Sequence, residues 1–67
     1  MRDRIEALRH IQKLNRELIQ AYDGLMGECA LTGDAKGFDK WLNKALECER
    51  HNFWIDKEID RIEMERR

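Results

Sequence analysis

The ten residues LTGDAKGFDK (31–40) divide the chain into two helical segments and thereby decide its fold. Gly33 suits the left-handed backbone conformation in which helices commonly end. Asp34 can accept hydrogen bonds from the free amide groups that begin the next helix. The stretch therefore predicts a short turn between two helices, and we place this turn at residues 32–37.

On the amino-terminal side, the pattern predicts one amphipathic helix over residues 3–31. With about 100° of rotation per helical residue, the apolar side chains from Ile5 onward fall within an arc of about 200°, and charged side chains take the other side. Gly24 and Gly27 each lower helix stability by ~1 kcal/mol relative to Ala, so a bend or an early helix end near them is an open alternative.

On the carboxy-terminal side, the pattern predicts a second helix over residues 38–65. Apolar residues and one asparagine recur there at alternating intervals of four and three residues, the heptad spacing of a helix that packs along another helix. The residues of this series are Trp41, Ala45, Cys48, Asn52, Ile55, Ile59 and Ile62. Leu42, Leu46 and Phe53 widen the apolar surface in the first half of the segment.

These features predict an all-α protein, a single antiparallel two-helix hairpin that spans residues 1–67. An apolar arc of about 200° is too wide for one facing helix to cover, so we expect two copies to form a homodimeric four-helix bundle. We expect the following residues in the core or the dimer contact: Leu18, Tyr22, Leu25, Trp41, Leu42, Leu46, Asn52, Phe53, Ile55, Ile59 and Ile62.

Composition narrows the classes of partner. Charged residues make up 40% of the 67-residue chain, yet the net charge is only −1, which lacks the positive excess typical of phosphate-binding proteins. No apolar run approaches the ~18 residues needed to cross a membrane, and the opening segment lacks the apolar stretch of a secretory signal. We therefore expect no membrane partner and a cytoplasmic location.

The residues that could carry chemistry predict no enzyme, no cofactor and no metal site. The chain contains no serine. His10 and His51 have no Cys, His or carboxylate partner at a ligand spacing, and both are expected at the surface. Cys29 and Cys48 match neither a CxxC pair nor a disulfide framework, so we expect free thiols that pack as small hydrophobic residues.

Two asparagines stand in apolar surroundings. Asn15 and Asn52 each lie near the middle of an apolar arc, where a polar amide is destabilising unless it is hydrogen-bonded. In an antiparallel hairpin they come to within about a turn of the same level. We expect them to form a structural pair that helps to set the helix register, with a polar ligand pocket as the alternative.

Trp54 is expected to point away from the helix–helix contact that its neighbours define. An outward Trp is a common anchor of protein interfaces, because it buries a large area with little loss of conformational entropy. Contact with the second copy and an incidental place at the surface are the alternatives. The predicted partner-binding surface comprises Trp54, Arg50, Lys57, Glu58 and Arg61.

One segment resembles a known repeat. GDAKGFDKWLNKALE (33–47) resembles the turn and second helix of a tetratricopeptide repeat, and Tyr22 and Leu25 stand near that repeat's first-helix aromatic residue and leucine. Met26 and Phe38 depart from it, because the repeat has small residues there. The resemblance covers about a third of the chain and implies a helix-turn-helix hairpin.

The overall plan is also similar to that of small plasmid-encoded hairpins, which dimerise into four-helix bundles and bind paired RNA loops. The leading functional hypothesis is a small non-enzymatic adaptor, inhibitor or regulator, of the kind that phage and mobile elements encode, acting on another protein. Two alternatives stay open. One is a dimeric RNA-binding hairpin that uses Arg2, Arg9, Lys13 and Arg16, and the other is a structural assembly component.

Overall fold

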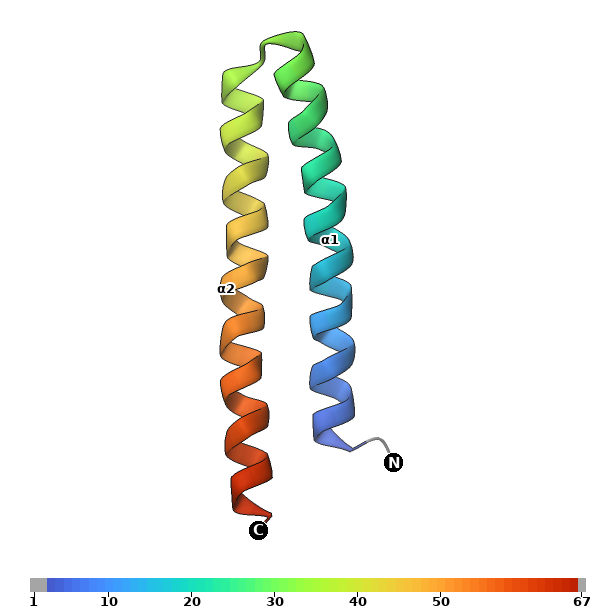
Figure 1. Ribbon diagram of the computed structural model, residues 1–67, viewed down its shortest axis with the longest axis vertical. Coiled ribbons are helices and arrows are strands. Elements are labelled where there is room, and N and C mark those ends of the chain that lie inside the picture. The colour runs from blue at the N-terminus through green and yellow to red at the C-terminus, as the bar shows by residue number, and fades with distance from the viewer. Residues whose placement is uncertain (1–2, 67) are drawn as a thin grey trace.

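The protein is an antiparallel pair of helices. The computed structural model describes residues 3–66, in which α1 (Arg4–Thr32) and α2 (Ala35–Glu65) lie side by side along their lengths (Figure 1). The predicted helical hairpin is confirmed. Neither helix combines the length and the apolar character needed to cross a bilayer.

The turn is shorter than its composition suggested. Gly33 ends α1 with a φ of 73°, and the amide of Asp34 donates to the carbonyl oxygen of Cys29 at 2.8 Å. The Asp34 carboxylate then accepts from the amide of Gly37 at 2.9 Å. Because Asp34 caps α2 directly, this helix begins at Ala35, three residues before the expected position.

The glycines inside α1 do not interrupt it. Gly24 and Gly27 both lie within the continuous helix Arg4–Thr32. A Cβ atom added at either position would meet no heavy atom within 4 Å. These glycines therefore neither end the helix nor permit a close contact with α2.

The contact between the helices follows one heptad series on each helix, which we call the seam. On α1 the seam consists of Ile5, Leu8, Gln12, Asn15, Ile19, Tyr22, Met26 and Cys29, and on α2 of Phe38, Trp41, Ala45, Cys48, Asn52, Ile55, Ile59 and Ile62. Its buried apolar members are all on α2: Ala45, Ile55, Ile59 and Ile62. Toward the turn, the rings of Tyr22 and Trp41 stack with centroids 5.7 Å apart.

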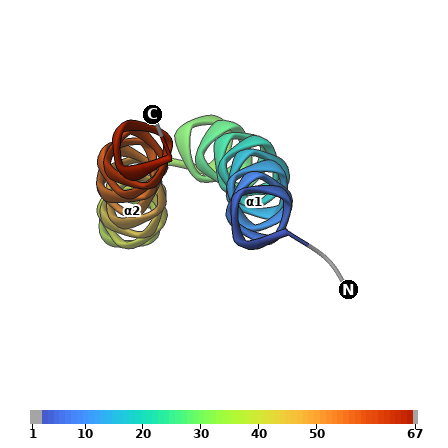
Figure 2. The same ribbon diagram turned by 90° about the horizontal axis from the view of Figure 1, so that it is seen from below.

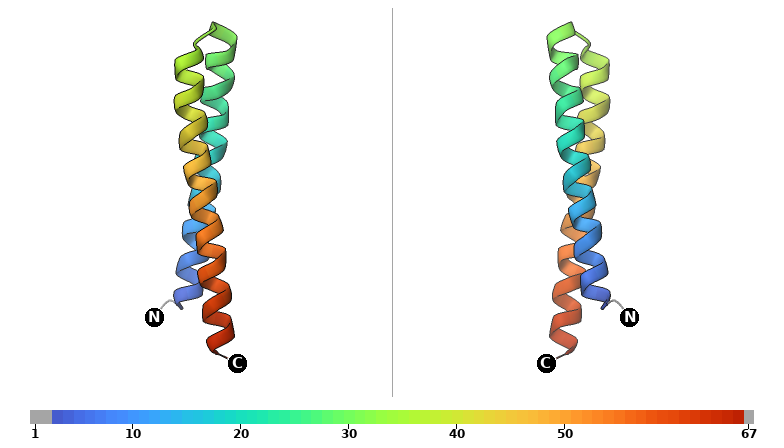
Figure 3. Two further views of the ribbon diagram at one scale, coloured as in Figure 1. Left: turned by 90° about the vertical axis from the view of Figure 1, so that its left-hand side faces the viewer. Right: turned by 90° about the vertical axis from the view of Figure 1, so that its right-hand side faces the viewer.

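The hairpin is a single layer of helices. Its Cα atoms extend over 52 × 19 × 11 Å, and the views along and across the helix axes show both broad faces of the pair open (Figures 2 and 3). Among the described residues no side chain is completely buried. A helical domain ordinarily packs a second layer onto such a surface.

Candidate interaction surfaces

Two ion pairs between the helices mark the two broad faces of the hairpin. Arg4 contacts Glu58 at 3.1 Å, and each of these residues directly precedes a seam residue. Arg9 contacts Glu63 at 3.5 Å, and each of these directly follows one. We name the faces the Arg4 face and the Arg9 face. A residue that precedes the seam therefore lies on the Arg4 face, and one that follows it lies on the Arg9 face.

An apolar strip that is exposed along its middle runs along α1 on the Arg4 face. Its members all directly precede seam residues and repeat at intervals of four and three: Ala7, Ile11, Leu14, Leu18, Ala21 and Leu25. We call this series the α1 strip. Ile11, Leu14 and Leu18 are all exposed, because α2 covers only the neighbouring seam.

A shorter apolar strip runs along α2 on the opposite face. Leu42, Leu46 and Phe53 each directly follow a seam residue and are exposed, and we call them the α2 strip. Because the two strips lie on opposite broad faces, neither helix can cover the strip of the other. The expectation that two facing helices leave apolar surface uncovered is confirmed at these residues.

The outer edge of α2 carries an exposed aromatic pair. Trp54 is 61% exposed, and its ring contacts that of Phe53 edge-on, with centroids 6.0 Å apart. The Lys57 ammonium group lies 5.1 Å from the centroid of the Phe53 ring. We call Phe53, Trp54 and Lys57 the aromatic ridge. The helical geometry placed Trp54 away from the seam, and its exposure agrees with that placement.

Of the other charged residues predicted around Trp54, some are already paired within the chain and one is not. Arg61 donates to Glu58 through Nε at 3.1 Å and to Glu65 through a terminal nitrogen at 3.0 Å. The hydrogen bond from Arg61 lowers the pKa of Glu58, and the same bond raises the pKa of Arg61. Arg50, by contrast, makes no salt bridge within residues 3–66. Its charge is therefore available to a partner.

A hydrogen-bonded polar layer crosses the middle of the seam. Asn15 donates through Nδ2 to Oδ1 of Asn52 at 2.8 Å, so the predicted asparagine pair is confirmed. Gln12 donates through Nε2 to Oδ1 of Asp56 at 2.6 Å and to the carbonyl oxygen of Asn52 at 3.2 Å. Asn52 donates in return to the carbonyl oxygen of Gln12 at 3.2 Å.

The polar groups of this layer form their hydrogen bonds with one another, which leaves no buried polar atom for a ligand. Gln12 and Asn15 are both buried, and the part of the chain that the structure describes has no buried side-chain polar atom without a hydrogen-bond partner. The sequence analysis predicted the asparagine pair but did not predict that Gln12 and Asp56 belong to this layer. The signal for Gln12 was its place in the seam, four residues after Leu8, where a polar residue needs a partner on the other helix.

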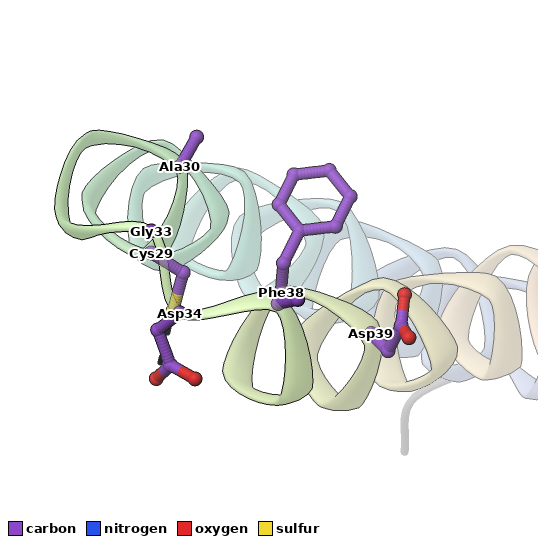
Figure 4. A pocket seen from close by; sticks show the side chains of 7 residues that line it. Cys29, Ala30, Gly33, Asp34, Phe38 and Asp39 are labelled. Atoms are coloured by element: carbon purple, nitrogen blue, oxygen red, sulfur yellow. Dashed lines mark hydrogen bonds between the residues drawn. The ribbon is translucent and has the colours of Figure 1, made fainter.

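An open hollow of about 320 Å³ lies beside the turn, lined by Cys29, Ala30, Gly33, Asp34, Ala35, Phe38 and Asp39. In Figure 4 the Phe38 ring and Ala30 extend to one side of the turn and the Asp34 carboxylate to the other. The Cys29 sulfur lies 3.9 Å from Oδ2 of Asp34. Loss of hydration, together with this carboxylate, raises the pKa of the Cys29 thiol, which makes it a weaker nucleophile.

The remaining candidates for chemistry are dispersed. Cys29 and Cys48 are free thiols, and His10 and His51 are exposed. No group of three or more His, Cys, Asp or Glu side chains within residues 3–66 is placed to hold a metal ion.

The basic residues of α1 do not form an unbroken stripe. Arg9 is paired with Glu63, and a shallow hollow of about 350 Å³ beside it is lined by Glu6, Arg9, His10 and Lys13, so an acidic group interrupts the basic ones. Arg2, which belongs to the same predicted RNA-binding set, lies outside the described residues.

Comparison of the chain with protein-family models, with curated proteins and with solved structures finds no match.

Proposed function

We propose that this protein acts by binding another protein through the aromatic ridge of α2, as an adaptor, inhibitor or regulator. The observation that carries the proposal is Trp54, which is 61% exposed on a long helix that the seam holds in place. An exposed Trp on a rigid element gives a large apolar contact at a small entropic cost.

The neighbours of Trp54 indicate the chemistry of the partner. Arg50 and Lys57 form no ion pair among the described residues. The ammonium group of Lys57 lies over the Phe53 ring. A complementary surface would offer an apolar cleft for the aromatic pair and carboxylates at its rim. The cleft would supply most of the affinity, and the charges would orient the complex.

We further propose that the protein is a homodimer that forms a four-helix bundle. The single helical layer and the two uncovered apolar strips support this arrangement. Its broad faces, with Cα extents of 52 × 19 Å, are large enough for the ~800 Å² per partner of a stable interface.

The partner hypothesis is tested by comparing Trp54→Ala with Met64→Ala in affinity capture from the native host lysate. Met64 is a matched control, because it is 72% exposed and lies on the same helix. A protein retained by the wild type and by Met64→Ala, but lost with Trp54→Ala, is expected.

The captured protein is then purified and added to a Trp41→Phe variant, in which Trp54 is the sole indole. A blue shift of its fluorescence is expected as Trp54 enters an apolar site. A partner that binds Trp54→Ala as tightly as the wild type would remove the hypothesis. Retention of RNA by both variants, falling steeply between ~50 and ~200 mM salt, would favour the RNA-binding alternative instead.

A further inference from the structure

The α1 strip has the pattern of a second seam. Its residues repeat at intervals of four and three from Ala7 to Leu25, as the seam residues of the same helix do, but they lie on the Arg4 face, beside the contact with α2. Such spacing fits a partner that is itself a helix, because knobs at these positions enter holes on a helical surface. The strip is therefore suited to a helix that runs along α1.

We infer that this helix is α1 of a second copy, packed antiparallel about a two-fold axis at the level of Arg16. The inference rests on the proposed homodimer and names its interface. In this arrangement Leu14 lies opposite Leu18 of the second copy, Ile11 opposite Ala21, and Ala7 opposite Leu25. Each small residue thus meets a large one, and the strip is complementary to itself, as a two-fold interface requires.

Charge at the two ends of the strip supports the same register. The next position before Ala7 in the four-and-three spacing is Arg4, and the next after Leu25 is Glu28. The antiparallel pairing places Arg4 of one copy opposite Glu28 of the other at both ends of the interface. Glu28 makes no salt bridge within residues 3–66 of a single copy. The second copy would supply its partner.

Three polar α2 residues on the Arg4 face fit this arrangement. Trp54, which directly precedes Ile55, lies on the same face and would adjoin the second copy. The hydrogen bond between Asn15 and Asn52 fixes which levels of the two helices coincide, so His51 lies at the level of Arg16 and near the axis. Lys44 and Glu58, both directly before seam residues, stand equally far from His51 along α2. The two-fold axis therefore brings Lys44 of one copy to the level of Glu58 of the other.

The α2 strip lacks this self-complementarity. An antiparallel pairing that sets Leu42 opposite Phe53 of a second copy also sets Leu46 opposite Glu49, which would bury a carboxylate against an apolar side chain. The Arg4 face is consequently the face for the second copy, and the Arg9 face stays outside the dimer.

The test compares Leu14→Lys with Leu46→Lys by sedimentation. The two leucines are matched, because each is 45% exposed and they lie on opposite broad faces. We expect the wild type and Leu46→Lys to show twice the chain mass of 8.1 kDa. Leu14→Lys should raise the dimer dissociation constant about 100-fold or more. Loss of the dimer in Leu46→Lys but not in Leu14→Lys would overturn the interface, as would intact dimers of both.

Charge exchange keeps the test valid if Leu14→Lys fails to fold. Glu28→Arg should weaken the dimer by placing like charges at both ends of the interface. Arg4→Glu combined with Glu28→Arg should restore it, and Arg4→Glu alone controls for loss of the Arg4–Glu58 ion pair within each chain. Circular dichroism checks that each variant stays helical. A helical wild type with the mass of a single chain would contradict the homodimer itself, whereas a dimer insensitive to charge exchange would contradict only this register.

Discussion

At the scale of single residues, the stability of the seam depends on a few polar side chains. The amides of Asn15 and Asn52 bond each other in the middle of an otherwise largely apolar contact. Such a pair adds little net stability, because each group gives up its bonds to water. Its main effect is to penalise any slip of one helix along the other, since a slip would leave buried amides without partners.

Removing one member of the pair should therefore be more harmful than removing both. We expect Asn15→Ala to lower the free energy of unfolding by about 1–3 kcal/mol, because the Asn52 amide oxygen loses its donor. The double variant Asn15→Leu with Asn52→Leu should be close to wild type in stability, but less specific in register. Urea unfolding followed by circular dichroism measures both. Equal stability of Asn15→Ala and the wild type would contradict this role.

Asp3 joins the two ends of the chain and should respond to acid. Two hydrogen bonds from Arg66, at 2.8 and 3.0 Å, tie it to the end of α2. These bonds, followed by the one from the amide of Ile5, lower the pKa of Asp3 from 3.8 to about 2. Because the folded pKa lies below the unfolded one, the contribution of Asp3 to folding is complete above the unfolded value and is lost as the pH falls through about 2.

An NMR titration of the Asp3 carboxyl group checks this prediction. In the wild type its midpoint should lie near 2, and in Arg66→Gln it should move up toward 3.8. Lys36→Gln is a control beside the turn, at the opposite end of the hairpin from Asp3 (Figure 1), and should leave the midpoint in place. A midpoint that is the same with and without Arg66 would show that the ends are not joined in solution.

At the scale of the elements, glycine stabilises the turn but destabilises the interior of a helix. Gly33 has a φ of 73°, which strains any residue with a Cβ atom, whereas Gly24 stands in regular helix with open space around it. The chain therefore offers a matched pair of glycine substitutions, one at each kind of site.

Gly33→Ala should lower the free energy of unfolding by about 1 kcal/mol or more, and Gly24→Ala should raise it by up to ~1 kcal/mol. The first change forces a left-handed conformation on alanine, and the second reduces the flexibility of the unfolded chain without a steric penalty in the helix. Thermal unfolding of both variants and of the wild type measures these changes in stability. Destabilisation by Gly24→Ala would indicate that α1 departs from regular helix at this position.

At the scale of the whole molecule, two helices one layer thick leave much apolar surface in water. Association of copies links folding to concentration, because only folded chains bind. We expect the unfolding temperature of the wild type to rise when the protein concentration is increased about 100-fold. Leu14→Lys should show no such rise, and Leu46→Lys should behave as the wild type. A concentration-independent wild-type transition would argue against the dimer.

Much of the molecule could be predicted from the sequence. Heptad spacing showed the α2 seam, Gly33 and Asp34 showed the turn, and the position of Trp54 among its neighbours predicted its exposure. Each of these depends on contacts local to one helix or one turn, where side-chain direction follows from residue number. The start of α2 was placed too late, because composition alone did not show that the Asp34 side chain caps the helix immediately.

The sequence by itself thus determined the two helices, their antiparallel order and the place of the turn at Gly33 and Asp34. Only the tertiary structure decided that the α1 strip and the α2 strip face opposite ways, and that Gln12 and Asp56 join the asparagine pair. The physical reason is that these features depend on the rotation of one helix against the other. That rotation is set by packing along the whole seam, and no stretch of either helix specifies it alone.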